Sequence, residues 1–179
     1  MNSFIIVETI HVNLSLVRPG MNLLIFVSSF GALQGVIILM SILFKFRHQK
    51  NLPLALLLIV FSVRQITIPT WNADVLITRP WLLPLTTPLP FLFGPFLWWY
   101  IRELSSNSRN VPKFFILHLF PYFIEVLLMT GTLLKMEGVE YEQFIHNVFT
   151  GNPPLWLPIR NGFKVVLNVA YLVLSARLA

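Results

Sequence analysis

Long apolar runs alternate with short polar segments along this chain, and the runs are too long for the interior of a soluble domain. Five of them, at about 21–44, 52–70, 81–101, 114–134 and 156–179, approach or exceed the roughly 20 residues that a helix needs to cross the hydrocarbon of a bilayer. The first run contains no charged residue. The pattern therefore predicts an all-α fold, a polytopic membrane helix bundle with about five transmembrane helices.

The third run differs from the others because it holds four prolines, at positions 84, 88, 90 and 95. An interior proline removes one helical hydrogen bond and disfavours the helical conformation of the residue before it. We therefore expect the third span to be proline-broken, with Pro88, Pro90, Gly94 and Pro95 acting as a kink or hinge. Whether these residues only bend the helix or also line a binding cavity is left open by the pattern.

The basic residues between the runs indicate an orientation, since loops rich in Lys and Arg stay in the cytoplasm. Seven fall on one side, namely Lys45, Arg47, Lys50, Arg102, Arg109, Lys113 and Arg177, and four on the other, namely Arg18, Arg79, Lys135 and Arg160. This distribution places the N-terminus outside. Residues 1–20 lack a basic start and a long apolar core, so we expect an extracytoplasmic leader there, unless the start codon is misplaced.

Composition agrees with lipid as the main partner. Hydrophobic residues make up 56% of the 179 residues and charged residues only 11%, too few to cover a soluble globule. The net charge of +6 comes from short clusters at the ends of apolar runs, and no continuous basic stripe could follow a phosphate backbone. We therefore expect no direct nucleic acid binding by this chain. Without cysteine, it has neither disulfides nor thiolate chemistry.

Three ionisable residues within the runs are candidates for a buried charge cluster or a ligand-binding site. Counted along their helices at 1.5 Å per residue, Arg64, Glu125 and Lys164 all lie about 16 to 18 Å from the inner face. Charges at such depth usually face the bundle interior and find partners. We expect Glu125 to pair with Arg64 and Lys164 to share the carboxylate. Three interpretations of these residues are possible. They form a structural clasp between helices, or they line a polar cavity for an anionic or polar ligand from outside, or Lys164 extends toward the membrane surface without a partner.

The first run contains the small-residue pattern of Gly31 and Gly35, which allows two helix backbones to approach closely. We interpret Gly31, Gln34 and Gly35 as a helix-packing surface within the bundle, with a homodimer as the alternative. His118, in the fourth run, is interpreted as a helix-packing residue. The histidines lie in separate segments without a spacing typical of metal ligands, so we expect no metal site.

Catalytic signatures are missing from the sequence. It has no GxSxG motif, no glycine-rich phosphate loop and no aspartate pair beside a basic segment. We therefore expect no catalytic residues, no cofactor and no enzymatic activity.

Two segments carry a family resemblance. The run Leu89-Pro-Phe-Leu-Phe-Gly-Pro-Phe-Leu-Trp-Trp-Tyr-Ile-Arg102 and the sequence His118-Leu-Phe-Pro121, preceded by the glycine pattern of the first run, resemble the N-terminal membrane region of membrane-bound AraC-type transcription regulators of bacteria. The similarity covers about residues 30–121. In that family a cytoplasmic helix-turn-helix domain follows the membrane region, and this sequence holds no such domain.

The resemblance implies a membrane-embedded sensory or signalling region in the bacterial inner membrane, without its own DNA-binding domain and with an unidentified extracytoplasmic ligand. Two alternatives remain open. A small transporter or channel component would also place charges at mid-depth, although the transporter-like repeat is missing. A structural or truncated membrane protein would have no independent activity.

Overall fold

The computed structural model describes residues 19–45, 51–68, 71–105, 112–136 and 138–178. Residues 1–18 of the expected leader (1–20) and residues 46–50 of the basic turn (45–50) lie outside the described residues. Every regular element in the described part is a helix: α2 (Pro19–Lys45), α3 (Leu52–Thr67), α4 (Ala73–Thr78), α5 (Leu82–Thr86), α6 (Pro90–Ser105), α7 (Phe115–Leu133), α8 (Gly138–Phe149) and α9 (Trp156–Ala176). The fold is all-α.

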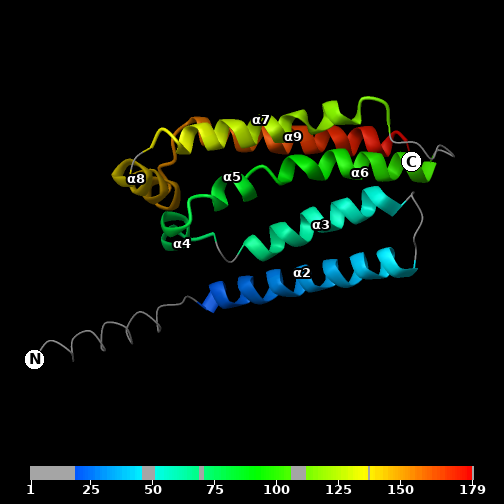
Figure 1. Ribbon diagram of the computed structural model, residues 1–179, viewed down its shortest axis with the longest axis horizontal. Coiled ribbons are helices and arrows are strands. Elements are labelled where there is room, and N and C mark those ends of the chain that lie inside the picture. The colour runs from blue at the N-terminus through cyan, green and yellow to red at the C-terminus, as the bar shows by residue number, and fades with distance from the viewer. Residues whose placement is uncertain (1–18, 46–50, 69–70, 106–111, 137, 179) are drawn as a thin grey trace, which may run out of the picture.

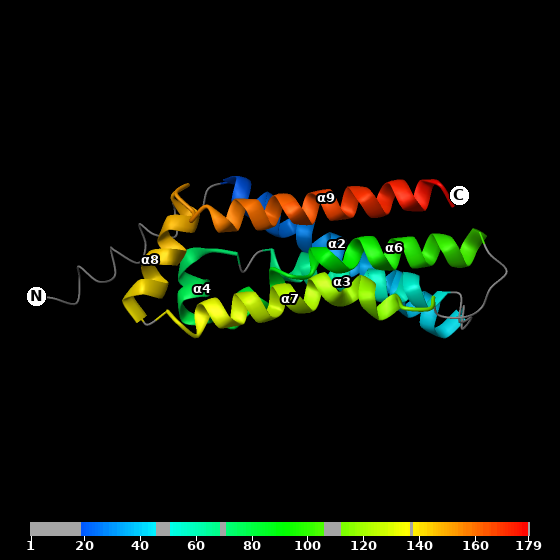
Figure 2. The ribbon, with the colours of Figure 1, turned by 90° about the horizontal axis from the view of Figure 1, so that it is seen from above.

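Long helices run back and forth along one axis, as Figure 1 shows, so that consecutive long helices are antiparallel. Helix α2 packs on α3, α3 packs on α6, and α6 packs on both α9 and α7. The short helices α4 and α8 contact each other at the end where α3 and α7 finish and α9 begins. We call this end of the bundle the capped end, and the other the open end (Figures 1 and 2).

Three described helices contain stretches long and apolar enough to cross a membrane, Ile25–Phe44, Phe115–Leu133 and Trp156–Ala176. Helix α3 is apolar but shorter, with 16 residues. Much of the outer surface of the long helices is apolar: Leu127 on α7 is 72% exposed and Val166 on α9 is 65% exposed. Such surfaces are stable against hydrocarbon and not against water, so the structure indicates a membrane protein.

In the third apolar run the chain forms two helices, with residues 87–89 between α5 and α6 non-helical. Pro90 is the first residue of α6, where its missing N–H costs nothing. Pro95 lies inside α6 and is fully buried. The carbonyl oxygen of Pro90 accepts a hydrogen bond of 3.0 Å from Asn168 Nδ2 of α9. A side chain of the neighbouring helix thus bonds the backbone just beyond the interruption.

Glycines set two of the helix contacts. An added Cβ at Gly35 would collide with Ser62 Oγ of α3, and one at Gly31 would touch the side chain of Gln65. The glycine pattern therefore packs within the bundle, against α3. Gln34 was expected to join this contact but is exposed, because one residue turns the helix by about 100°. At Gly94 an added Cβ would lie 2.5 Å from Tyr171 Cδ2, so the glycine allows α6 and α9 to pack closely.

The segments 72–80 and 135–155, which the sequence pattern leaves as outer loops between the predicted spans, each contain a helix, α4 and α8 respectively. Asn72 caps α4, its Oδ1 accepting from the N–H of Val75 at 2.9 Å. In α8 the buried residues Tyr141, Phe144 and Ile145 lie on one face. This spacing is that of an amphipathic helix, so α8 could have been predicted from the sequence.

Candidate functional site

The ionised side chains of α7 and α9 meet inside the bundle. Glu125 of α7 is 4% exposed, and its Oε2 accepts hydrogen bonds from Arg160 Nε at 2.9 Å and pairs with Arg160 Nη2 at 2.7 Å. Its Oε1 pairs with Lys164 Nζ at 3.0 Å. Arg160 and Lys164 are four residues apart in α9 and therefore share one face of that helix. We call these three residues the ion cluster.

The ion cluster corrects one expectation. Lys164 does contact Glu125, but the second cation is Arg160 and not Arg64. Counting along the helices placed Glu125 and Lys164 at one level, and these two side chains do meet, but the count does not show in which direction a side chain points around its helix. Helix α3, which carries Arg64, packs on α2 and α6. Arg64 instead stacks over the indole of Trp71, with its Cζ 5.5 Å from the ring centroid.

The cations of the ion cluster have further contacts that fix their positions. Arg160 lies over the ring of Trp156 at 4.9 Å, and Lys164 Nζ lies 5.6 Å from the centroid of Phe91 on α6. Lys164 Nζ also donates to Asn161 Oδ1 at 3.1 Å. One carboxylate and two cations leave one net positive charge among largely apolar neighbours. Such a group is costly at membrane depth unless all its members are held together.

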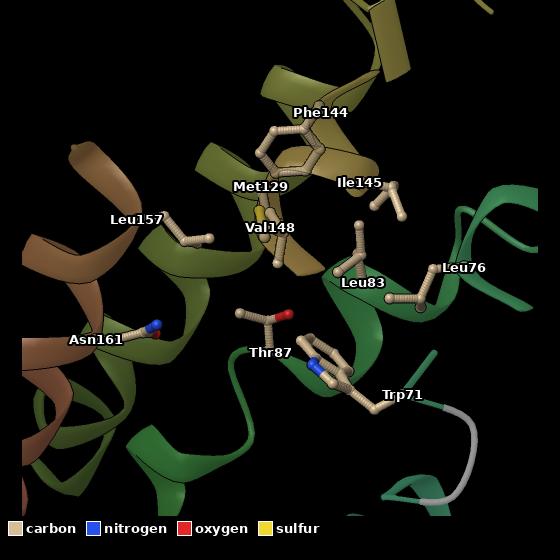
Figure 3. A pocket seen from close by; sticks show the side chains of 10 residues that line it. All are labelled: Trp71, Leu76, Leu83, Thr87, Met129, Phe144, Ile145, Val148, Leu157 and Asn161. Carbon is tan, nitrogen blue, oxygen red and sulfur yellow. The ribbon is translucent and has the colours of Figure 1, made fainter. Parts of the chain in front are cut away.

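Next to the ion cluster, at the capped end, lies a cavity of about 150 Å³ (Figure 3). Its walls come from α4, α5, α7, α8 and α9. The apolar side chains that line it include Leu76, Leu83, Met129, Phe144, Ile145 and Val148. Five helices thus meet around one small, largely apolar space at the capped end.

Polar groups reach the cavity from two sides. Thr87, in the interruption between α5 and α6, is 9% exposed, and its Oγ1 has no hydrogen-bond partner in the described part of the chain. Asn161 of α9 also lines the cavity but is exposed, so it stands at the edge of the cavity (Figure 3). Since Asn161 Oδ1 bonds Lys164, a single side chain belongs both to the cavity wall and to the surroundings of the ion cluster.

One side-chain hydrogen bond joins helix α8 to helix α4 beside the cavity. The carbonyl oxygen of Leu76 in α4 has no helical donor four residues on, because Pro80 lacks an N–H. Tyr141 of α8 supplies the donor, its hydroxyl lying 2.6 Å from that oxygen. Burial raises the pKa of Tyr141 to about 12. The phenol is therefore a neutral donor at physiological pH.

Of the hinge candidates, none lines the cavity. Pro88 and Pro95 are fully buried, Pro90 opens α6, and Gly94 packs on Tyr171. The residue of this region that reaches the cavity is Thr87, which the sequence did not single out because an isolated threonine carries no pattern.

His118 packs between helices, as expected. Its Nδ1 lies 2.7 Å from the hydroxyl of Tyr171 on α9, and its ring is 4.8 Å from that of Trp98 on α6. Among the described residues, no group of three His, Asp or Glu side chains could hold a metal ion.

Comparison with known proteins gives no match: no protein-family model, no curated protein and no solved structure is similar to this chain.

Proposed function

We propose that this chain is the membrane-embedded sensory region of a bacterial transcription regulator of the AraC type. In this proposal it crosses the inner membrane five times, with the N-terminus and the capped end outside. The prolines interrupt the third span, and a DNA-binding domain would act at the open end. The resemblance of Leu89–Arg102 and His118–Pro121 to that family supports the regulator assignment.

One observation carries the sensory part of the proposal, namely that Asn161 lines the cavity and also accepts a hydrogen bond from Lys164 of the ion cluster. A molecule in the cavity touches Asn161, which accepts the hydrogen bond from Lys164, which in turn pairs with Glu125. Occupancy of the cavity would therefore favour one arrangement of the ion cluster over another. A ligand can shift a conformational equilibrium only through such a difference in contacts.

From the ion cluster two contacts lead to α6, the helix that reaches the open end. Lys164 lies over Phe91, and Asn168, one turn further along α9, bonds the carbonyl oxygens of both Lys164 and Pro90. A small movement of α9 would thus displace the start of α6. The rest of α6 is a continuous helix to Ser105, so the displacement would be carried to the open end.

The test measures whether the open end responds to a change at the ion cluster. Because the chain has no cysteine, spin labels attach only to the introduced Ser105→Cys and Arg177→Cys, which are exposed residues at the open end of α6 and just beyond the end of α9. We expect Arg160→Gln to shift the distance distribution between the labels, measured by electron paramagnetic resonance in lipid nanodiscs. The matched control is Glu140→Gln on the exposed surface of α8, which should leave the distribution unchanged. We call this path from the ion cluster through α6 to the open end the relay. An unchanged distance distribution in Arg160→Gln would refute it.

A small transporter is the second candidate, because buried charges beside an interrupted helix are also found where ions cross a membrane. Flux through vesicles that contain the purified chain would support this candidate against the sensor. A reading frame for a helix-turn-helix domain on the same transcript would support the regulator.

A further inference from the structure

We infer that the cavity at the capped end binds a small, neutral, mainly apolar molecule with one hydrogen-bonding group, of the size of a phenol. This inference deepens the proposed function, since it names the class of molecule that the sensory region would detect. It is carried by the volume of the cavity, the chemistry of its walls and the unpartnered hydroxyl of Thr87.

Volume limits the ligand to a single ring or a short chain. A cavity of about 150 Å³ with largely apolar walls can hold one molecule of about the size of benzene. A peptide, a sugar or a lipid headgroup is too large or too polar. The walls at Leu83, Phe144 and Ile145 offer no hydrogen bond from their side chains, so the body of the ligand must be apolar.

The hydroxyl of Thr87 is the reason why we expect the ligand to carry a hydrogen-bonding group. A buried polar atom without a partner is costly, and such atoms are rare in folded proteins. Thr86, its neighbour in the sequence, shows the usual solution: it is 1% exposed, and its hydroxyl donates to the carbonyl oxygen of Leu82 at 2.7 Å. Thr87 is also buried, but its hydroxyl makes no such bond, and it lines the cavity. A ligand hydroxyl or carbonyl would supply its missing partner.

A neutral ligand fits better than an anion. None of the residues that line the cavity is charged, and the cations Arg160 and Lys164 are paired with Glu125. Arg64 stacks over Trp71 of the cavity wall and is not itself part of the wall. An anion in the cavity would lie against apolar side chains without a partner of opposite charge, which is unfavourable in a medium of low dielectric constant. Because the ion cluster carries one net positive charge, an anionic probe is included in the test.

The experiment uses three fluorinated probes and the full chain in lipid nanodiscs, with binding measured by fluorine NMR line broadening. The probes are 4-fluorophenol, its near-isostere 4-fluorotoluene, which lacks the hydroxyl, and the anion 4-fluorobenzoate. Because apolar probes also dissolve in lipid, the variant Val148→Phe, which fills the cavity, provides the blank. We expect 4-fluorophenol to be broadened beyond this blank and 4-fluorobenzoate not to be.

Two matched variants test the role of Thr87. Replacing Thr87 by the isosteric valine should weaken the binding of 4-fluorophenol about 3- to 10-fold, the effect of one hydrogen bond, and leave that of 4-fluorotoluene unchanged. Thr86→Val, one residue away but outside the cavity wall, should change neither probe. Since the Thr87 hydroxyl makes no bond in the structure, its replacement should not impair folding.

Equal broadening of 4-fluorophenol by the parent chain and Val148→Phe would overturn the inference. So would preferential binding of 4-fluorobenzoate, which would instead indicate an anionic ligand drawn to the ion cluster. The proposed relay fails separately: if 4-fluorophenol binds but the distance between labels at positions 105 and 177 does not respond to Arg160→Gln, the binding site stands and the sensory function does not.

Discussion

Removing the carboxylate of the ion cluster is the most informative perturbation of this fold. The variant Glu125→Gln keeps the shape of the side chain but leaves Arg160 and Lys164 as two unpaired cations in a largely apolar environment. Glu125 makes contacts of 2.7, 2.9 and 3.0 Å with these two residues, and its side chain is 4% exposed. Loss of one partner of a buried ion pair costs about 3 to 5 kcal/mol. We expect a loss in the free energy of unfolding within this range.

Measuring the effect of Glu125→Gln in two further variants shows whether Lys164 or Arg64 interacts with Glu125. In Lys164→Met one of the two stranded cations is absent, so Glu125→Gln should cost at least about 1 kcal/mol less than in the parent chain. In Arg64→Gln the cost of Glu125→Gln should change less than it does in Lys164→Met, because Arg64 makes no ion pair with Glu125 whereas Lys164 does.

The free energy of unfolding would be measured by denaturant titration in bicelles, with helix content as the signal. Glu140→Gln, on the exposed surface of α8, is the control for loss of a carboxylate as such, and we expect it to change stability by less than about 0.5 kcal/mol. Strong coupling of Glu125 to Arg64, with additivity toward Lys164, would refute the ion cluster as described.

Two further predictions concern packing and pH. Gly94→Ala should destabilise the chain by about 1 to 3 kcal/mol, because the new methyl group would meet the Tyr171 side chain; Gly162→Ala, where the structure leaves open space, should be neutral or stabilising in the same titration. The raised pKa of Tyr141, about 12 in the fold against 10.0, means that the folded chain holds its phenolic proton more tightly than the unfolded chain. That stability is complete below pH 10 and is lost as the pH rises toward 12, by about 2 to 3 kcal/mol in total. Tyr141→Phe should reduce the loss of stability measured between pH 9 and 12, whereas the other groups that titrate in this range keep their contribution; an unchanged slope in the variant would disprove the assignment to Tyr141.

The sequence was informative about helices and depth. The apolar runs predicted the positions of α2, α3, α7 and α9 to within a few residues, because length and hydropathy are local properties. The depth of Glu125 and Lys164 followed from the helical rise, and these two side chains do meet. The glycine pattern also predicted a close helix contact within the bundle, which Gly35 makes with Ser62.

What the sequence did not predict depends on the direction of side chains and on contacts between distant segments. Arg160 was assigned to the outer end because it lies near the start of its run, although its four-residue spacing from Lys164 places both on one face of α9. Helices α4 and α8 lie in segments between the apolar runs, which the run pattern left as outer loops. The cavity could not be predicted, since it is formed by side chains from five helices.

The arrangement of the chain across the membrane is the claim on which the rest depends, and single cysteines test it directly. The parent chain has no cysteine, so Glu142→Cys on α8 and Ser105→Cys at the end of α6 each introduce one reactive thiol on an exposed residue. We expect a membrane-impermeant maleimide to label Glu142→Cys on intact spheroplasts and to label Ser105→Cys only after the membrane is opened. Labelling of both positions on intact spheroplasts, or of position 105 alone, would contradict this arrangement.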